Sequence, residues 1–257
     1  MWSRSGLLVA AVAVVGCNDI DLPARPAGGG VGIDLPGEPV PPIDAPVDAF
    51  TLGDASLVQL NGLVCVIRDL RLPEQCPPVT SDNAGIIVRE SGIVEAATTD
   101  LEGRFTLPVT SPTVVLDIGD NVVALQRSRA RVAVAPTVIE VPVVTAADFA
   151  AVLDSLAVPF ADDTGAIVVR VDDRGAPARG VVFDMVPGSA FPTFFDGATA
   201  LAWRDQGGTG AAGAALMVDV PPGTFTLTGV APDGRVIEIS NVSVEANRIT
   251  FVRGSLP

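Results

Sequence analysis

Residues 97–107 read Ala97-Thr98-Thr99-Asp100-Leu101-Glu102-Gly103-Arg104-Phe105-Thr106-Leu107, and this stretch decides the fold. Asp100 to Gly103 has the composition of a turn, and glycine can take the positive φ that such a turn requires. The residues that follow alternate, so Phe105 and Leu107 share one face of a strand and the polar residues share the other. The stretch therefore predicts a turn that leads into a half-buried β-strand.

The same texture continues from about Ala55 to the end of the chain. Short apolar runs are separated by turn residues every 8–12 positions, which is typical of β-sandwiches. The chain has 26 Gly and 22 Pro, and charged residues make up 18% of it, so long amphipathic helices are disfavoured. We expect an all-β fold, with one strand at Thr199–Trp203 and another after the turn at Pro221-Pro222-Gly223.

Two segments resemble the carboxypeptidase regulatory-like domain, a prealbumin-like β-sandwich. The first is residues 97–107, and the second is Val220-Pro221-Pro222-Gly223-Thr224-Phe225-Thr226-Leu227. The two segments carry complementary halves of one family pattern, which suggests a tandem repeat. The resemblance implies two tandem antiparallel β-sandwiches. Such domains accompany another activity, and no peptidase domain is attached here.

The pattern along the chain predicts five parts. These are a signal peptide (1–16), a lipidated Cys and Pro/Gly/Asp-rich linker (17–54), a first β-sandwich (55–145), a short helix and connector (146–162) and a second β-sandwich (163–257). The linker has no apolar periodicity, so we expect a disordered tether. For the helix, Phe149, Val152, Leu153 and Leu156 repeat at helical spacing, and Thr145 can cap the start.

The N-terminus has the layout of a secretory signal. A positive charge at Arg4 precedes an apolar run that is too short to span a membrane, and the run ends at Val14-Val15-Gly16-Cys17. These four residues resemble the lipobox of bacterial lipoproteins. The resemblance implies that the Cys17 thiol receives a lipid and becomes the first residue. We expect an exported protein that is lipid-anchored to the outer membrane or the cell surface; an ordinary signal peptide is the alternative.

The sequence contains three cysteines. Lipid would occupy Cys17, which leaves Cys65 and Cys76. A close pair in an exported chain indicates a disulfide, because the compartment is oxidising. Two free thiols are the alternative, and a metal site of two Cys without His is disfavoured.

Composition excludes several classes of function. The net charge is −14 and no basic face is visible, so we expect no nucleic-acid binding. The sequence has no His and no Lys, which excludes Ser-His-Asp catalysis, Cys-His pairs, Schiff bases and Lys–Asn isopeptide crosslinks. Only carboxylate chemistry survives, and we expect no enzyme activity, no cofactor and no metal.

Acidic motifs are the remaining candidates for chemistry. Asp163-Thr164-Gly165 matches half of an aspartic-protease site, but the second Asp is missing, so a turn entering a strand is favoured. The pairs Asp162-Asp163 and Asp172-Asp173 could ligate calcium, yet without an EF-hand spacing they are better interpreted as solvated turn carboxylates.

A cluster of aromatic residues is the one candidate binding site. Phe191, Phe194, Phe195 and Trp203 gather outside a clear strand. Such loops can stack on sugars, or they can plug the end of a sandwich. We therefore expect a non-enzymatic binding or scaffold module whose partners are the membrane and a protein or carbohydrate of the cell envelope. A carbohydrate-binding module that uses residues 191–203 is the alternative, and a carboxylate-only hydrolase is a distant third.

Overall fold

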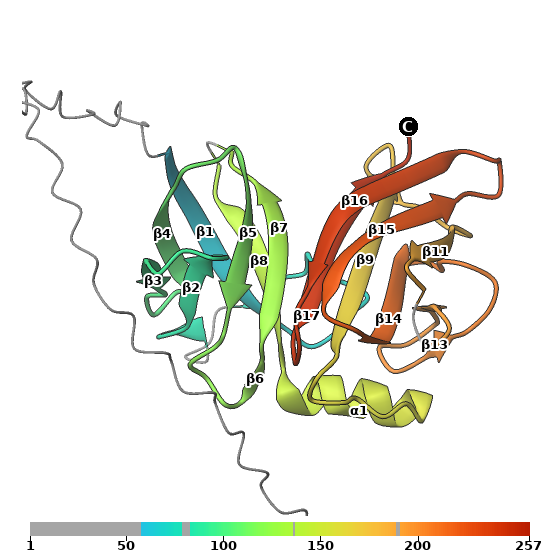
Figure 1. Cartoon of the computed structure of the whole chain (residues 1–257), viewed down its shortest axis with the longest axis horizontal. Coiled ribbons are helices and arrows are strands. Elements are labelled where there is room, and N and C mark those ends of the chain that lie inside the picture. The colour runs from blue at the N-terminus through green and yellow to red at the C-terminus, as the bar shows by residue number, and fades with distance from the viewer. Residues whose placement is uncertain (1–57, 79–82, 136, 189–190) are drawn as a thin grey trace, which may run out of the picture. The chain divides into compact units, whose positions relative to one another are not determined.

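The computed structural model describes residues 58–78, 83–135, 137–188 and 191–257 (Figure 1). The chain up to residue 57, which includes the predicted signal peptide, Cys17 and the tether, lies outside the described residues. The first half contains β1 (Val58–Ile67), β2 (Ile87–Glu90), β3 (Ala96–Thr98), β4 (Arg104–Val109), β5 (Thr113–Ile118), β6 (Leu125–Gln126), β7 (Ser128–Ala133) and β8 (Ile139–Thr145).

A single helix among the described residues, α1 (Ala146–Leu156), connects the halves. The second half contains β9 (Gly165–Asp173), β10 (Ala176–Pro177), β11 (Val182–Val186), β12 (Phe194–Asp196), β13 (Trp203–Arg204), β14 (Ala214–Val220), β15 (Gly223–Val230), β16 (Val236–Val244) and β17 (Ile249–Ser255). The fold is all-β with one short helix, as the sequence predicts.

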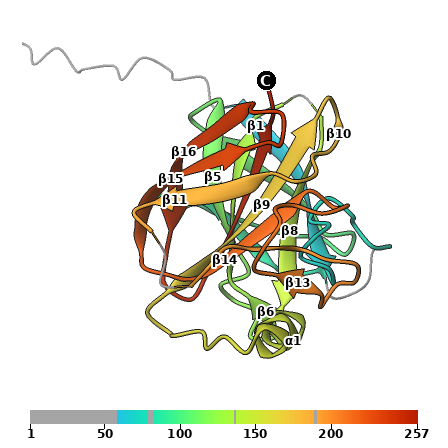
Figure 2. The same cartoon turned by 90° about the vertical axis from the view of Figure 1, so that its right-hand side faces the viewer.

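The strands form three sheets. A four-stranded sheet has the order β4-β1-β8-β6, and a three-stranded sheet has the order β11-β15-β16. A ten-stranded sheet runs β13-β12-β14-β9-β17-β7-β5-β2-β3, with β10 paired to β9 beside this path. Figure 2 looks onto the second half, where β9 and β14 lie beneath β11 and β15 and α1 is seen end-on. Each half is thus a sandwich of a small sheet against part of the large one.

The large sheet is continuous between the halves. β17 pairs with β7 in parallel, from Ile249 opposite Ser128 to Phe251 opposite Ala130. One hydrophobic cluster accordingly includes Leu60 of the first half and Phe251 of the second. The sequence predicts two sandwiches in tandem, and the structure adds that they share a sheet. The predicted boundaries of the parts at residues 145 and 162 stay a prediction.

The two halves have matching topology. In the first half, β1 lies between β4, which is antiparallel to it, and β8, which is parallel. In the second half, β9 lies between β14, which is antiparallel, and β17, which is parallel. In both halves the first strand is therefore flanked by the strand that follows the turn motif and by the last strand.

Two buried threonines show the same repeat at atomic detail. Thr99 Oγ1 accepts a hydrogen bond from the Ile86 N–H and donates to a backbone carbonyl. Thr209 Oγ1 makes the same pair of bonds, with the N–H of Val181 as donor. A glycine follows each threonine by four residues, with φ of 78° at Gly103 and 66° at Gly213. The tandem repeat suggested by the sequence is present in these hydrogen bonds.

The quoted turn and strand form as predicted. Asp100 Oδ1 accepts from the Glu102 and Arg104 N–H groups and closes the turn. Phe105 and Leu107 are buried, and the polar residues between them are exposed. This strand therefore supplies one face to the core of the first sandwich.

Helix α1 also matches the prediction. The Thr145 side chain accepts from the Asp148 N–H as the N-cap, and Phe149, Val152 and Leu153 are buried. Ala157 ends the helix in the left-handed region with a φ of 54°. The helix thus packs its apolar stripe onto the core, as the spacing predicts.

One detail of the second half differs from the prediction. The strand predicted at Thr199–Trp203 is wrong, because the chain turns over residues 198–201 and pairs through β12 and β13 on either side. A strand does follow the Pro221-Pro222-Gly223 turn, as predicted, and it is β15. β15 pairs with β11 and β16, so the turn carries the chain from the large sheet to the small one.

Candidate functional site

The predicted anchor, Cys17, lies outside the described residues, so lipidation stays a prediction. None of the helices in the described part of the chain is long and apolar enough to cross a membrane.

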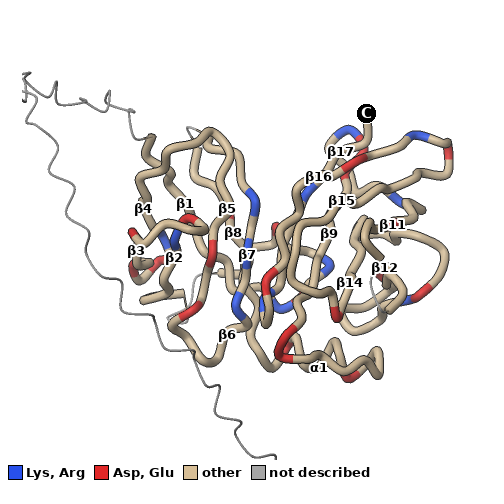
Figure 3. Tube along the Cα trace, viewed as in Figure 1, with Lys and Arg blue, Asp and Glu red and all other residues tan. Residues whose placement is uncertain are grey.

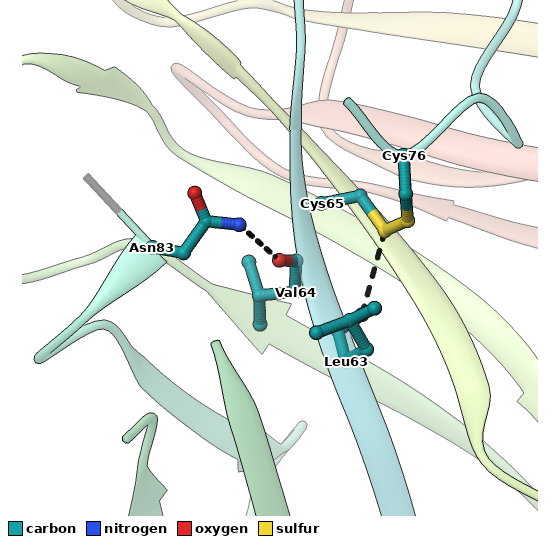
Figure 4. The surroundings of a disulfide bond; sticks show 5 residues. All are labelled: Leu63, Val64, Cys65, Cys76 and Asn83. Atoms are coloured by element: carbon teal, nitrogen blue, oxygen red, sulfur yellow. Dashed lines mark hydrogen bonds between the residues drawn. A yellow bond between two sulfur atoms is a disulfide. The ribbon is translucent and has the colours of Figure 1, made fainter. Parts of the chain in front are cut away.

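The predicted disulfide is present. Cys65 on β1 and Cys76 are bonded, with their Cα atoms 5.0 Å apart (Figure 4). Cys65 is buried, and beside it Asn83 Nδ2 donates to the Val64 carbonyl at 2.8 Å. The bond closes the loop of residues 68–75, which we call the strap.

The strap reaches the second half of the chain. Arg71 is held by the Asp69 carboxylate, and its Nη1 donates to the Gly197 carbonyl at 2.9 Å. The hydrogen bonds that Arg71 donates to Asp69 raise the pKa of Arg71, outweighing burial, which lowers it. Glu74 lies 3.7 Å from Arg170 Nε and 3.4 Å from Arg253 Nη1. The disulfide thus holds a loop that links the two repeats.

The aromatic cluster is part of the core. Phe194, Phe195 and Trp203 are 7%, 4% and 8% exposed, and Phe191 is half-buried. Because neighbouring strand residues point to opposite faces, Phe194 packs in one core cluster and Phe195 in the other. The indole of Trp203 donates to the Ala200 carbonyl. Stacking on a sugar needs an exposed ring face, so the rings of Phe194, Phe195 and Trp203 plug the sandwich. A binding role for the half-buried Phe191 stays a prediction.

Asp196 is a buried polar residue that was not predicted from the sequence. It is 1% exposed and accepts from the N–H groups of Gly210, Ala212 and Ala214 at 2.6, 2.7 and 2.9 Å. By the repeat, these residues correspond to the turn that Asp100 caps from within. Gly210 occupies the position that Asp100 has in the first half, so the second turn lacks its own capping Asp. This difference between the repeats was the one signal in the sequence that a carboxylate from elsewhere caps the turn.

A buried charge network joins the repeats. The Arg129 side chain on β7 is 2% exposed. Its Nε donates to Asp117 Oδ1 at 2.7 Å, its Nη1 donates to Ser243 Oγ at 2.9 Å, and it pairs with Glu245. Figure 3 shows the arginine positions recurring along β7, next to the second repeat. Asp117 belongs to the first half, and Ser243 and Glu245 belong to the second, so one guanidinium bridges them.

Arg248 makes the reverse connection, from the second half to the first. Its Nη1 lies 2.8 Å from Asp120 Oδ1, and its Nε lies 2.9 Å from Glu245. Burial raises the pKa of Asp120, but Arg248 and Arg89 outweigh it, and the pKa lies below the ordinary value. Burial likewise lowers the pKa of Arg129, and its carboxylate partners raise it by more. Arg129 and Arg248 therefore link the two halves through ion pairs with Glu245 and Asp120.

The acidic pairs considered for calcium lie on or before β9. Asp172 pairs with Arg253 at 2.6 Å and Asp173 with Arg235 at 2.8 Å, so both carboxylates are occupied by guanidinium groups. They lie in a strand and not in a solvated turn. In the Asp163-Thr164-Gly165 segment, the Thr164 hydroxyl donates a hydrogen bond to the Asp219 carboxylate, and Gly165 begins β9. This is the arrangement expected for a turn entering a strand.

A cleft of about 790 Å³ opens between the repeats. Its lining includes Glu74 of the strap, Arg131 of β7, Glu140 of β8, Arg170 of β9 and Arg253 of β17. Nothing in the sequence pattern indicates this site, because its residues come from both halves and meet only through the shared sheet.

No protein-family model matches the sequence, and no curated protein matches it. Solved structures to which the chain is similar include the minor pilin GBS52 of Streptococcus agalactiae, at 12% identity and a TM-score of 0.26 over 77% of this chain and 94% of that one. The TIE protein of Bacillus anthracis has 12% identity and a TM-score of 0.24 over 78% of this chain and 34% of that one.

The shaft pilin SpaA of Lactobacillus rhamnosus GG has 10% identity and a TM-score of 0.21 over 78% of this chain and 98% of that one. At these identities and TM-scores the similarity carries no argument about function. The functional interpretation therefore rests on the residues of this chain.

Proposed function

We propose that the chain is a non-enzymatic bacterial lipoprotein, anchored through Cys17, whose two β repeats act as one rigid binding or scaffold module of the cell envelope. The observation that carries the proposal is the junction between the repeats. The shared sheet, the buried charges around Arg129 and the disulfide strap all cross it. Repeats joined by a flexible linker would need none of these contacts.

The buried carboxylates support a structural role. Asp117, Asp172 and Asp196 are the buried acidic residues in the described part of the chain. Asp117 accepts from Arg129, Asp172 from Arg253 and Asp196 from three backbone N–H groups. A carboxylate-only hydrolase needs two carboxyl groups that face the substrate, whereas these three are engaged in holding the fold.

The anchor is tested on the full chain expressed with its own leader in a bacterium. Mass spectrometry of the mature N-terminus should find Cys17 as the first residue, carrying lipid, and the protein should sediment with membranes. Cys17→Ser should move it to the soluble fraction, whereas Asp54→Asn should leave it with the membranes. An unmodified Cys17, or a Cys17→Ser variant that still sediments with membranes, contradicts the anchor.

Rigidity is tested separately, with spin labels on the two repeats. Val94 and Val186 are exposed, at 96% and 66%, and lie in different halves, so each can be replaced by a labelled cysteine in a Cys17→Ser background. We expect one narrow distance distribution. A broad distribution means that the repeats move independently and refutes the scaffold proposal.

A further inference from the structure

The cleft between the repeats begins where two paired strands separate. β7 and β17 pair only from Ser128 opposite Ile249 to Ala130 opposite Phe251. Beyond this point Arg131–Ala133 continue with β5 and Val252–Ser255 continue with β9. In the described structure, each of these two segments has a partner strand on one side and the cleft on the other.

A free strand edge is a template for an added strand. The four residues Val252–Ser255 span about 13 Å at ~3.3 Å per residue, which is enough for several backbone hydrogen bonds. Small side chains at Ala133, Gly254 and Ser255 line the cleft and leave the backbone accessible. Its volume, about 790 Å³, lies in the range of about 300–1,000 Å³ that ligand sites occupy.

The cleft brings together several arginines of this acidic chain. Arg131, Arg170 and Arg253 line it against Glu74 and Glu140, in a protein whose net charge is −14. Arg170 and Arg253 are opposite each other on neighbouring strands and point to the same face. Asp172 pairs with Arg253 at 2.6 Å and lies 3.4 Å from Arg170, so three arginines meet three carboxylates here. The cleft therefore concentrates guanidinium donors rather than net positive charge.

Arg170 has hydrogen-bonding capacity that the chain does not use. Its side chain is 9% exposed, and its Nε and Nη1 make no hydrogen bond. The nearest carboxylates are Asp172, at 3.4 Å from Nη2, and Glu74, at 3.7 Å from Nε. Both separations exceed the ~2.7–2.9 Å of a charge-assisted hydrogen bond. A buried guanidinium in this state favours a further carboxylate.

Glu74 shows where that carboxylate would lie. Its side chain is 40% exposed, and it approaches both Arg170 and Arg253 without a close contact to either. It lies on the strap, which covers this face of the sheet. A carboxylate from another molecule could displace Glu74 into solvent and bond both arginines directly.

We propose that this cleft binds an extended, acidic segment of a partner protein. The segment pairs its backbone with the free strand edges and places an Asp or Glu side chain at Arg170 and Arg253. This inference rests on the proposed function in that it names a partner class for the scaffold. Peptide binding in solution does not depend on the lipid anchor. A chain that binds no peptide would therefore refute this inference and leave the proposed anchor standing, and the reverse also holds.

The test uses random octapeptides displayed on phage and panned against the immobilised full-length chain. We expect enriched sequences in which an Asp or Glu is flanked by β-branched residues. The most enriched peptide is then synthesised, together with a copy whose acidic residue is replaced by its amide. Fluorescence anisotropy should show binding that is at least 10-fold weaker for the amide copy.

Variants of the chain identify the site. Arg253→Gln also removes the partner of the buried Asp172, so its urea midpoint is measured first. In the folded variant, peptide binding should weaken at least 10-fold. Glu74→Gln removes the competing carboxylate and should tighten binding about 3- to 10-fold. Arg104→Gln, on the exposed face of β4, is the matched control and should leave affinity unchanged.

Several results would overturn the proposal. These are no enrichment above background, enriched peptides that lack acidic residues, or binding that Arg253→Gln leaves intact. A second copy of the chain is the competing occupant. Light scattering that finds a dimer in the original chain and a monomer in Arg253→Gln would assign the cleft to self-association and refute the partner peptide.

Discussion

Replacing Asp196 by Ala should destabilise the protein more than replacing any residue that caps a turn from an exposed position. The carboxylate is 1% exposed and accepts from three backbone N–H groups at 2.6–2.9 Å. Two of these donors belong to Ala212 and Ala214, which are themselves buried. An unsatisfied buried donor costs about 1–3 kcal/mol, so the two together should lower the free energy of unfolding by about 2–6 kcal/mol.

Urea denaturation followed by tryptophan fluorescence measures this loss. With a slope of about 2 kcal/mol/M, the midpoint should fall by roughly 1–3 M. Asp100→Ala is the matched control, because Asp100 caps the equivalent turn of the first repeat from an exposed position. Water can replace it, so that variant should lose only about 0.5–1.5 kcal/mol. If the two variants lose equal stability, Asp196 is not the internal cap that the structure indicates.

Three further predictions concern stability. The depressed pKa of Asp120 adds stability above the unfolded carboxyl pKa of about 4, and this stability should be lost as the pH falls through the lower folded value. The free energy of unfolding of Arg248→Gln should therefore fall less steeply on acidification than that of the original chain. An unchanged dependence on pH would count against the pairing. The double variant Cys65→Ser/Cys76→Ser should lose about 3 kcal/mol in its free energy of unfolding in urea, and its stability should no longer change with reductant. A double variant as stable as the original chain would mean that the strap is held without the disulfide. Thr145→Ala should lower the thermal midpoint through a loss of about 0.5–2 kcal/mol at the N-cap of α1, with Thr145→Ser as the neutral control; equal losses in both would exclude capping as the cause.

Local features were predictable because short-range rules decide them. The turn at Asp100, the alternation after it and the cap of α1 depend on residues within a few positions of one another. The Cys65–Cys76 bond was also predictable, because the sequence predicts an exported chain in which Cys17 carries lipid and the two remaining cysteines can pair. The strand predicted at Thr199–Trp203 was wrong, since alternation in a short apolar run does not show which residues find a partner strand.

The burial of most of the predicted aromatic cluster was not predictable, for a related reason. Composition shows that Phe194 and Phe195 are close together, but burial depends on what covers them. β14 pairs with β12, so both rings lie in the core, one on each face of the sheet. The Asp196 cap depends on the same pairing, which brings a carboxylate to a turn that begins fourteen residues later in the chain.

The sequence by itself determined the fold class, the repeat and the disulfide, because alternation, turn residues and cysteine number act locally or through composition. Only the tertiary structure decided that the repeats share a sheet and that Arg129 and Arg248 bridge them. It alone also placed Arg170, Arg253 and Glu74 around one cleft. The physical reason is that pairing β7 with β17 joins residues more than a hundred positions apart, and no local preference specifies that register.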